Sequence, residues 1–462
     1  MESSPRRSIP EAPGSGSVAS RPGGTSAERG VISRIWLECS STHRHDMNTG
    51  IQRVVRNIVN AAAEMSGTNG VPAQGLWFDD RLGYQSVRQL PLPRRQLPWE
   101  ASSITGWRLK VRNFLQSLRL LDATQMVRNL RKRGQKASRT LLRRWFRRGV
   151  LPGRGEVLLL VDCTWDPEFA WQDLYRARQR GALIGVVVYD LIPLERPEFV
   201  DEGLRIKFLE CWKTLRATAD FMVCISRSVA DDVARYEAAL VHKGWPRIDR
   251  PVGWFTLGSE LDALEVGASC RPELTALLPA EGPREGLLMV GSINPRKNHD
   301  LALDACELCW QRGGQQKLIV AGGIGWECAS QIQRLREHPE LGRRLFWFPD
   351  LADHELDYCY RRCQALVTPS LAEGFNLPIV EALSRGATVL ASDLPVHREV
   401  GRQFAGYFPT DNPAALASLI DQLAATNLLP GVTNPAEFRW PNWKESCREL
   451  LAETERLAGA CR

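Results

Sequence analysis

The stretch PSLAEGFNLPIVEALSRG, residues 369–386, places two carboxylates, Glu373 and Glu381, eight positions apart. A glycine, an aromatic residue, an asparagine and a proline lie between them, a combination for which a surface helix has no evident use. The apolar run ALVTPS (365–370) comes just before and predicts a buried strand. The stretch therefore reads as the loop and helix that follow a strand, which is the repeating unit of an α/β fold.

The helix has recognisable ends. Pro378 suits the first helical turn because it has no N–H group to leave unpaired, and Gly386 suits the position just after the last turn. We expect a helix over about 378–385. Glu373 then lies in the preceding loop, and Glu381 lies one turn inside the helix.

Such a loop can bind an anion at the start of the helix. Unpaired N–H groups near Phe375, Asn376 and Leu377 would hold a phosphate, and Gly374 would let the backbone approach it closely. The two glutamates could accept hydrogen bonds from hydroxyl groups on either side, as a nucleotide-sugar would supply them. The alternative is a plain helix cap in which Glu381 favours the helix dipole. The spacing alone leaves both interpretations open.

Strand, loop and helix units recur on both sides of this stretch. The runs are continuous and apolar, as expected for parallel strands covered on both faces. Those in the first half are RIWLEC (34–39), GLWF (75–78), EVLLLVD (156–162), LIGVVVYD (183–190) and DFMVCIS (220–226). Those in the second half are GLLMVGS (286–292), KLIVAGG (317–323), RLFWF (344–348), ALVTPS (365–370) and ATVLAS (387–392). We predict an α/β protein with two doubly wound domains.

The chain of 462 residues is too long for one compact core, which agrees with two domains. Composition and the apolar runs suggest five segments: a disordered Ser-, Pro- and Gly-rich segment (1–29), an N-terminal domain (30–258) with a basic helical insertion at about 100–150, a linker (259–285), a C-terminal domain (286–430) and a helical segment (431–462).

The composition, with 44% hydrophobic and 24% charged residues, is that of a soluble globular protein. No apolar run approaches the roughly 20 residues of a membrane span, and the N-terminus lacks the apolar core of a secretory signal. Twelve cysteines in this length do not suggest a disulfide scaffold. Cys306 and Cys309 lie within a helical pattern without a second pair, so we expect no metal site. The cytoplasm is the expected compartment.

A basic segment, 108–148, contains fourteen Lys or Arg and one acid, Asp122. Its end, TLLRRWFRRGV (140–150), has arginines opposite leucines and aromatic residues at helical spacing. One hypothesis is a helix lying on the inner face of the cytoplasmic membrane. The other is an amphipathic helix packed on its own domain. Nucleic acid is not an expected partner because few aromatic residues accompany the charge.

The stretch around Glu373 and Glu381 closely resembles the donor-site motif of retaining glycosyltransferases of family 4, although Asn376 stands where glycine is common. This resemblance implies the GT-B architecture of two Rossmann-like domains facing each other. Further stretches are similar to bacterial family members that build cell-surface polysaccharides: GSINPRKNHDLAL (291–303), GIGWE (323–327), REHPELGRRLFWF (336–348), LPVHREV (394–400), NTGIQRVVRN (48–57), DLIPLERPEF (190–199), CISRSVADDV (224–233) and WFTLGSEL (254–261).

The resemblance also implies residue roles. Lys297 and Arg296 would neutralise the donor diphosphate, although two charged loop residues can also be merely solvated. Glu373 would orient the transferred sugar, and Glu381 would bind the ribose hydroxyls. The amides of Phe375, Asn376 and Leu377 would contact the phosphates. Gly50 would lie near them, and the stretch 349–351, with Asp350, would lie near the base. Arg53 and Arg56 are more often a solvated helix face.

Family members frequently carry a histidine at the end of the strand that we place at 183–190. This chain has Tyr189 before Asp190 there, so no catalytic histidine is predicted. His43 and His45 lie in the loop after the first strand, where histidines are usually solvated. No Asp-x-Asp motif follows a strand, so we expect neither a metal nor another cofactor.

The predicted function is transfer of a hexose, with mannose suggested by the family members, from a nucleotide-sugar to a glycan or lipid-linked glycan. The resemblance implies retention of configuration and a role in surface polysaccharide synthesis. Two alternatives stay open: a nucleotide-sugar epimerase on the same fold, and a catalytically silent protein that binds sugar or nucleic acid.

Overall fold

The computed structural model describes residues 32–45, 49–65, 70–91, 149–166, 168–259, 261 and 269–461. The segment 1–29 and the basic segment 108–148 lie outside these residues, and so does the hypothesis of a membrane-bound helix. Within the described residues, no helix combines the length and the apolar character that crossing a membrane requires.

The first domain is built on a sheet in the order β3-β2-β1-β4-β5-β6-β7. All neighbouring strands are parallel except β2 and β3, which form an antiparallel pair at one edge. The strands are β1 (Arg34–Glu38), β2 (Ala73–Asp79), β3 (Gly83–Val87), β4 (Glu156–Leu160), β5 (Leu183–Val188), β6 (Phe221–Cys224) and β7 (Val252–Trp254). Every residue of β5 and β6 is buried, as their uninterrupted apolar runs predict.

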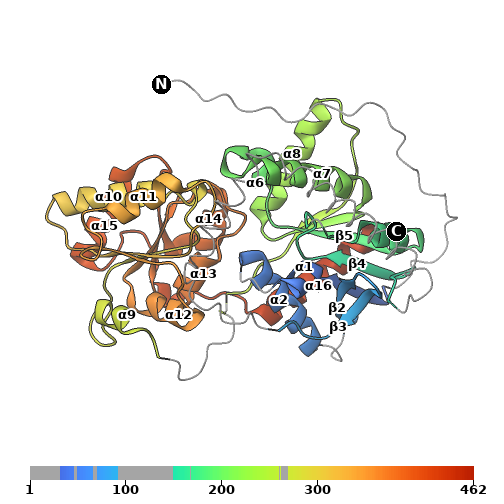
Figure 1. The fold of residues 1–462 in the computed structure, drawn as a ribbon, viewed down its shortest axis with the longest axis horizontal. Helices are drawn as coiled ribbons and strands as arrows, with labels where there is room; N and C mark the ends of the chain where they lie inside the picture. The colour runs from blue at the N-terminus through green and yellow to red at the C-terminus, as the bar shows by residue number, and fades with distance from the viewer. Residues whose placement is uncertain are drawn as a thin grey trace, which may run out of the picture.

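Helices cover this sheet, and one of them comes from the far end of the chain (Figure 1). They are α1 (Ser40–Arg44), α2 (Gly50–Met65), α5 (Trp171–Gln179), α6 (Ile192–Glu195), η1 (Pro197–Phe199), α7 (Glu202–Thr218), α8 (Arg227–His242) and α16 (Trp443–Ala460). Helix α16 packs on α2, β6 and β7, and the Cys447 thiol contacts the Ile58 carbonyl. The C-terminal helix therefore completes the N-terminal domain.

The second domain has an all-parallel sheet in the order β10-β9-β8-β11-β12-β13, which is the strand order 3-2-1-4-5-6 of dinucleotide-binding folds. The strands are β8 (Leu287–Val290), β9 (Leu318–Ala321), β10 (Leu345–Phe348), β11 (Ala365–Thr368), β12 (Thr388–Ser392) and β13 (Ala405–Phe408).

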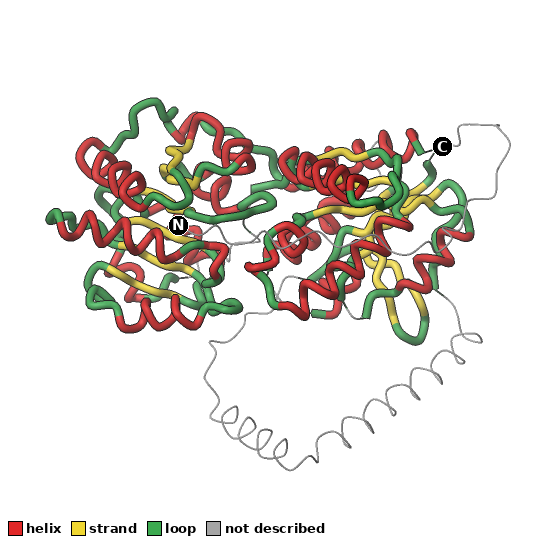
Figure 2. Tube along the Cα trace, turned by 90° about the horizontal axis from the view of Figure 1, so that it is seen from above, coloured by secondary structure: helices red, strands yellow, loops and turns green. Residues whose placement is uncertain are grey.

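The second sheet also has helices on both faces, and Figure 2 shows the two layered domains from above. The helices are α9 (Pro272–Leu277), η2 (Pro295–Lys297), α10 (His299–Gln311), α11 (Ala329–Glu337), α12 (Asp353–Arg362), α13 (Leu377–Ser384), α14 (Pro395–Gly401), η3 (Arg402–Phe404), α15 (Pro413–Thr426) and η4 (Pro435–Glu437). The predicted GT-B architecture of two Rossmann-like domains is confirmed.

The strand order of the second sheet fixes where a ligand can bind. The order reverses between β8 and β11, and ligands of open α/β sheets bind beyond the carboxyl ends of the strands at such a point. The segment 291–298 leaves β8 there, and the segment 369–376 leaves β11 beside it. The quoted stretch therefore starts at the reversal point of the second sheet.

Candidate active site

The segment after β8 forms a short turn that presents two cations. The Asn294 side chain accepts a hydrogen bond from the Lys297 amide at 3.2 Å and donates one to the Ser292 carbonyl at 3.0 Å. Asn298 ends the turn in the left-handed conformation, with φ of 54°. A Cβ at Gly291 would lie 3.1 Å from Lys297 Cε, so a side chain there would press on the lysine. The turn thus fixes where Lys297 points.

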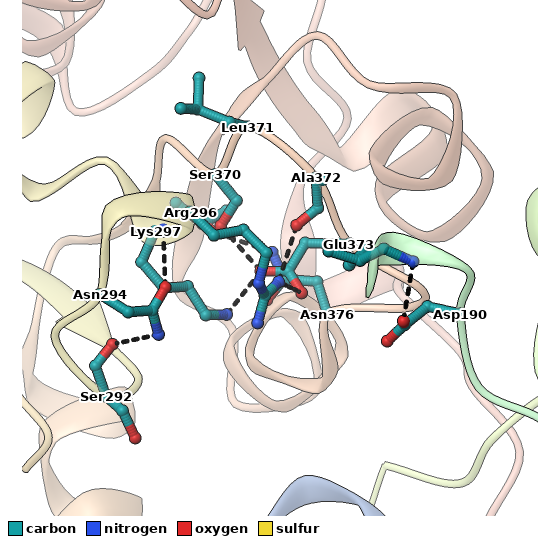
Figure 3. Close-up of polar contacts among 12 residues, drawn as sticks. Asp190, Ser292, Asn294, Arg296, Lys297, Ser370, Leu371, Ala372, Glu373 and Asn376 are labelled. Carbon is teal, nitrogen blue, oxygen red and sulfur yellow. Dashed lines mark hydrogen bonds and ion pairs between the residues drawn. The ribbon is translucent and has the colours of Figure 1, made fainter. Parts of the chain in front are cut away.

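Arg296 and Lys297 converge on Glu373 (Figure 3). Lys297 Nζ lies 2.5 Å from Glu373 Oε1, and Arg296 Nη1 lies 2.5 Å from Oε2. Ser370 Oγ donates to Oε1 at 2.8 Å, and Arg296 also donates to the Ala372 carbonyl at 2.7 Å. All three charged side chains are at most 16% exposed. The structure thus brings the three predicted catalytic residues together.

The opposite charges in this cluster shift the pKa values of its three side chains. Burial alone would raise the pKa of Glu373, but Arg296 and Lys297 outweigh it and hold that pKa well below the usual range. Burial lowers the pKa of Lys297, and the Glu373 carboxylate only partly opposes this shift. For Arg296, the carboxylates of Glu373 and Asp190 outweigh burial and raise the pKa. Glu373 is therefore ionised at neutral pH.

The lowered pKa of Lys297 predicts a pH dependence of anion binding. The ammonium form dominates only below that lowered pKa, so the charge is lost before the value of about 10.4 of an ordinary lysine. We expect the affinity for a nucleoside diphosphate to fall as the pH rises through the alkaline range below about 10.4. Lys297→Arg should keep its affinity over this range, because a guanidinium keeps its proton.

Titration calorimetry at several pH values measures this difference. Lys317→Arg is the matched control, since Lys317 contacts the Leu277 carbonyl away from the cluster and should leave the pH dependence unchanged. Parallel affinity curves for the wild type and Lys297→Arg would contradict the assignment of the alkaline loss to Lys297.

Glu381 is buried at an ion pair between the domains. Its Oε1 accepts a hydrogen bond from Arg53 Nη2 of α2 at 2.8 Å, and its Oε2 accepts one from the Tyr360 hydroxyl of α12 at 2.7 Å. The side chain is only 1% exposed. Each carboxylate oxygen retains a second lone pair, so ribose binding by Glu381 stays a prediction. Sequence reasoning gave Arg53 little weight and did not single out Tyr360.

Asn376 takes the conformation that glycine usually adopts. Its φ is 76°, and it caps the start of α13. Its Nδ2 donates to Thr368 Oγ1 at 2.7 Å and to His397 Nε2 at 2.8 Å. His397 Nδ1 faces the Ser392 carbonyl at 2.8 Å and therefore carries the ring proton. The Asn376 side chain thus anchors the left-handed backbone. Nothing in the sequence indicated that Thr368 and His397 are its partners.

Two substitutions separate the backbone effect from the side-chain effect at this position. Asn376→Gly should lower the free energy of unfolding by about 1–3 kcal/mol, since it leaves buried polar groups unpaired. Asn376→Ala should cost about 1–2 kcal/mol more, because a Cβ without a local hydrogen bond is strained at this φ. Urea unfolding of the two variants measures the difference. Equal midpoints would contradict the backbone argument.

The amides of Phe375, Asn376 and Leu377 make no hydrogen bond within the described part of the chain, as anion binding requires. The Phe375 ring is buried edge-to-face against Trp440 at 6.0 Å, so only its backbone can meet a ligand. Gly50 begins α2, and apart from its chain neighbours and the backbone of α2, no described atom lies within 4 Å of a Cβ added at this position.

Asp350, the predicted base contact, is engaged elsewhere in the structure. Its Oδ1 accepts a hydrogen bond from Arg271 at 2.9 Å, which holds the carboxylate toward the start of α9. Its contact with a nucleobase stays a prediction. Among the described residues, no group of three or more His, Cys, Asp or Glu could hold a metal ion.

The sequence of the second domain matches a known protein family. Residues 273–430 match the family of glycosyl transferases group 1. The chain contains a glycosyltransferase group 1 domain. That domain spans α9 to α15 and includes Glu373, Glu381 and Lys297.

Relatives and a solved structure extend the comparison. Over 315 residues, which are 68% of this chain and 38% of the relative, the chain is 33% identical to the serotype-specific mannosyltransferase WbdA of Escherichia coli. It is 32% identical to the O-antigen chain mannosyltransferase B of Escherichia coli over 165 residues, which are 34% of this chain and 42% of the relative. The matches thus span about two-fifths of these relatives.

A likeness to a solved structure extends beyond the matched domain. A sucrose-phosphate synthase structure from Thermosynechococcus elongatus covers 92% of this chain and 94% of its own, with a TM-score of 0.50 and 15% identity. At this identity the likeness concerns the fold alone.

Proposed function

We propose that the protein is a retaining glycosyltransferase that moves a hexose from a nucleotide-sugar to a glycan or lipid-linked glycan acceptor in surface polysaccharide synthesis. The observation that carries the proposal is the contact of Glu373 with Lys297 and Arg296 beside three unpaired amides, at the reversal point of a glycosyltransferase group 1 domain. Mannose is the proposed sugar because the two similar Escherichia coli proteins are named as mannosyltransferases.

The leaving diphosphate takes its stabilisation from fixed charges. Lys297 and Arg296 carry two positive charges, and the amides at the start of α13 add the positive end of the helix dipole. Groups positioned before the reaction stabilise developing charge without reorganising, and one such donor is worth on the order of 10²–10³ in rate. The Arg296 and Lys297 side chains would share their hydrogen bonds between Glu373 and the phosphates.

Glu373 would orient the transferred sugar. Its Oε2 accepts from Arg296 and has a second lone pair for a sugar hydroxyl. In the proposed reaction the bond from the anomeric carbon to the phosphate breaks, and the acceptor hydroxyl attacks on the same face. The acceptor proton passes to the leaving phosphate oxygen, so the step needs no separate base.

A screen of purified protein against nucleotide-sugars tests this proposal. We expect release of the nucleoside diphosphate from one class of donor, GDP-mannose first, and an anomeric NMR signal of the same configuration in product and donor. Lys297→Ala should remove turnover, and the remote Lys317→Ala should not. Turnover that survives Lys297→Ala, or an inverted product, would overturn the proposal. Interconversion of two nucleotide-sugars without transfer would indicate an epimerase instead.

A further inference from the structure

The first domain touches the loop that holds Glu373. Ser226, which follows β6, donates a hydrogen bond from its Oγ to the Gly374 carbonyl at 2.8 Å. The same hydroxyl accepts from the Val229 amide at 3.1 Å and so caps α8. Ser226 is 1% exposed. One buried hydroxyl thus joins a helix start of the first domain to the residue after Glu373.

This hydrogen bond acts on the phosphate-binding amides. The Gly374 carbonyl and the Phe375 N–H belong to one planar peptide unit, in which the two groups point in opposite directions. Fixing the carbonyl oxygen therefore fixes the direction of the Phe375 N–H. That N–H is one of the unpaired amides at the start of α13. The contact from Ser226 thus aims a group that is proposed to hold the diphosphate.

A carboxylate of the second domain holds the same helix start. Glu399 of α14 accepts hydrogen bonds from the amides of Arg227 at 2.7 Å and Ser228 at 2.8 Å, and from the Ser228 hydroxyl at 2.5 Å. The first amides of a helix have no partner within the helix, and a carboxylate there also favours the helix dipole. Helix α8 therefore takes part of its N-terminal cap from the other domain.

The hydrogen bonds of this cap cross the boundary between the two domains. Glu399 is half-buried, so water can replace its hydrogen bonds when the helix start moves away. On the same helix, His397 contacts Asn376 at 2.8 Å on the other side. Helix α14 thus joins the residue that starts α13 to the first domain.

We propose that Ser226 is a positioning residue for the loop 373–377 (the donor loop) and that the Glu399 cap on α8 holds Ser226 in place across the domain boundary. This inference rests on the proposed function, since it assigns to Ser226 and Glu399 the alignment of the phosphate-binding amides. Donor binding should depend on these two residues less than the transfer step does, because negative charge on the leaving diphosphate develops during transfer.

Hydrogen exchange tests the cap without any activity. In Glu399→Ala, the amides of Arg227 and Ser228 should exchange faster than in the wild type, and so should the Ile379 amide, which donates to the Asn376 carbonyl at 3.0 Å. Glu449→Ala is the matched control, because its carboxylate also accepts a backbone N–H, from Thr256 at 3.1 Å, but within the first domain. If these amides exchange at the same rates in Glu399→Ala and in Glu449→Ala, the proposal is overturned. This readout does not depend on whether the protein transfers sugar.

Kinetics test the positioning role. Glu399→Ala and Ser226→Ala should lower kcat by up to about 100-fold, with a much smaller change in the donor dissociation constant. Ser226→Thr keeps the hydroxyl that donates to the Gly374 carbonyl and caps α8, so this variant should restore most of the rate. A donor dissociation constant that rises as much as kcat falls, or a Thr variant no better than Ala, would contradict positioning.

Discussion

Glu373→Gln should lower kcat for sugar transfer by a factor of about 10²–10³. The amide has the size of the carboxylate but no charge, so Lys297 and Arg296 lose the partner that lies 2.5 Å from each of them. The hydroxyl of the bound sugar also loses a charged acceptor, and hydrogen bonds to charged groups are about twice as strong as neutral ones. The rate is best measured in single turnovers with the donor found in the screen.

The control for Glu373→Gln is a buried ion pair of the first domain. Glu237 accepts from Arg216 Nε at 2.8 Å, and Glu237→Gln should destabilise the fold while folded molecules keep their kcat. Both variants should lose about 3–5 kcal/mol of stability, because each removes the carboxylate that a buried arginine contacts directly. Equal rates in the two variants would show that Glu373 serves the fold alone.

The stability cost of Glu373→Gln should depend on pH. The folded-state pKa of Glu373 lies below its unfolded value of about 4.3, so its contribution is complete above that pH and is lost as the pH falls. The difference between the wild type and Glu373→Gln should therefore shrink in acid. Chemical unfolding at two pH values, one on each side of about 4.3, measures it.

Gly374→Ala should lower kcat by about 100-fold while each domain stays folded. A Cβ at this position would lie 2.1 Å from the Tyr189 carbonyl and 3.2 Å from Asp190 Cβ, both in the first domain. Backbone atoms cannot yield as a flexible side chain does, so the two domains must separate or the donor loop must shift. Either movement displaces the Gly374 carbonyl from Ser226 and the neighbouring Glu373 from its position.

Gly459→Ala is the control for this substitution. Gly459 lies in α16 with no atom within 4 Å of a new Cβ, so alanine should be neutral or slightly stabilising there. Small-angle scattering of both variants reports domain separation, and donor titration reports binding. Full transfer activity in Gly374→Ala would contradict the close contact between the first domain and the donor loop.

The sequence predicted those parts of the fold that depend on local pattern. Fully buried strands such as β5 and β11 are uninterrupted apolar runs, and their loops carry turn residues. Strand β7 has only three residues, and β13 (AGYF) begins with two small residues, so neither stands out from its surroundings. The packing of α16 on the first domain depends on tertiary contacts with α2, which no local pattern encodes.

The candidate site divides in the same way. Glu373, Lys297 and the α13 amides lie in two short stretches with strong turn signals, and these were predicted. Arg53 reaches Glu381 across 328 positions, and Ser226 reaches Gly374 across 148. Partners at such separations are set by how the two domains meet. The helical periodicity around Arg53 predicted only a charged residue on a helix and not its contact with Glu381.

The most direct test of the account is a crystal structure with the nucleoside diphosphate of the preferred donor. The account predicts a phosphate within hydrogen-bond distance of Lys297 Nζ and of the amides of Phe375 and Leu377, with a ribose hydroxyl near Glu381. A nucleotide bound at any other place on the second domain, with the contacts of Glu373 unchanged, would contradict it.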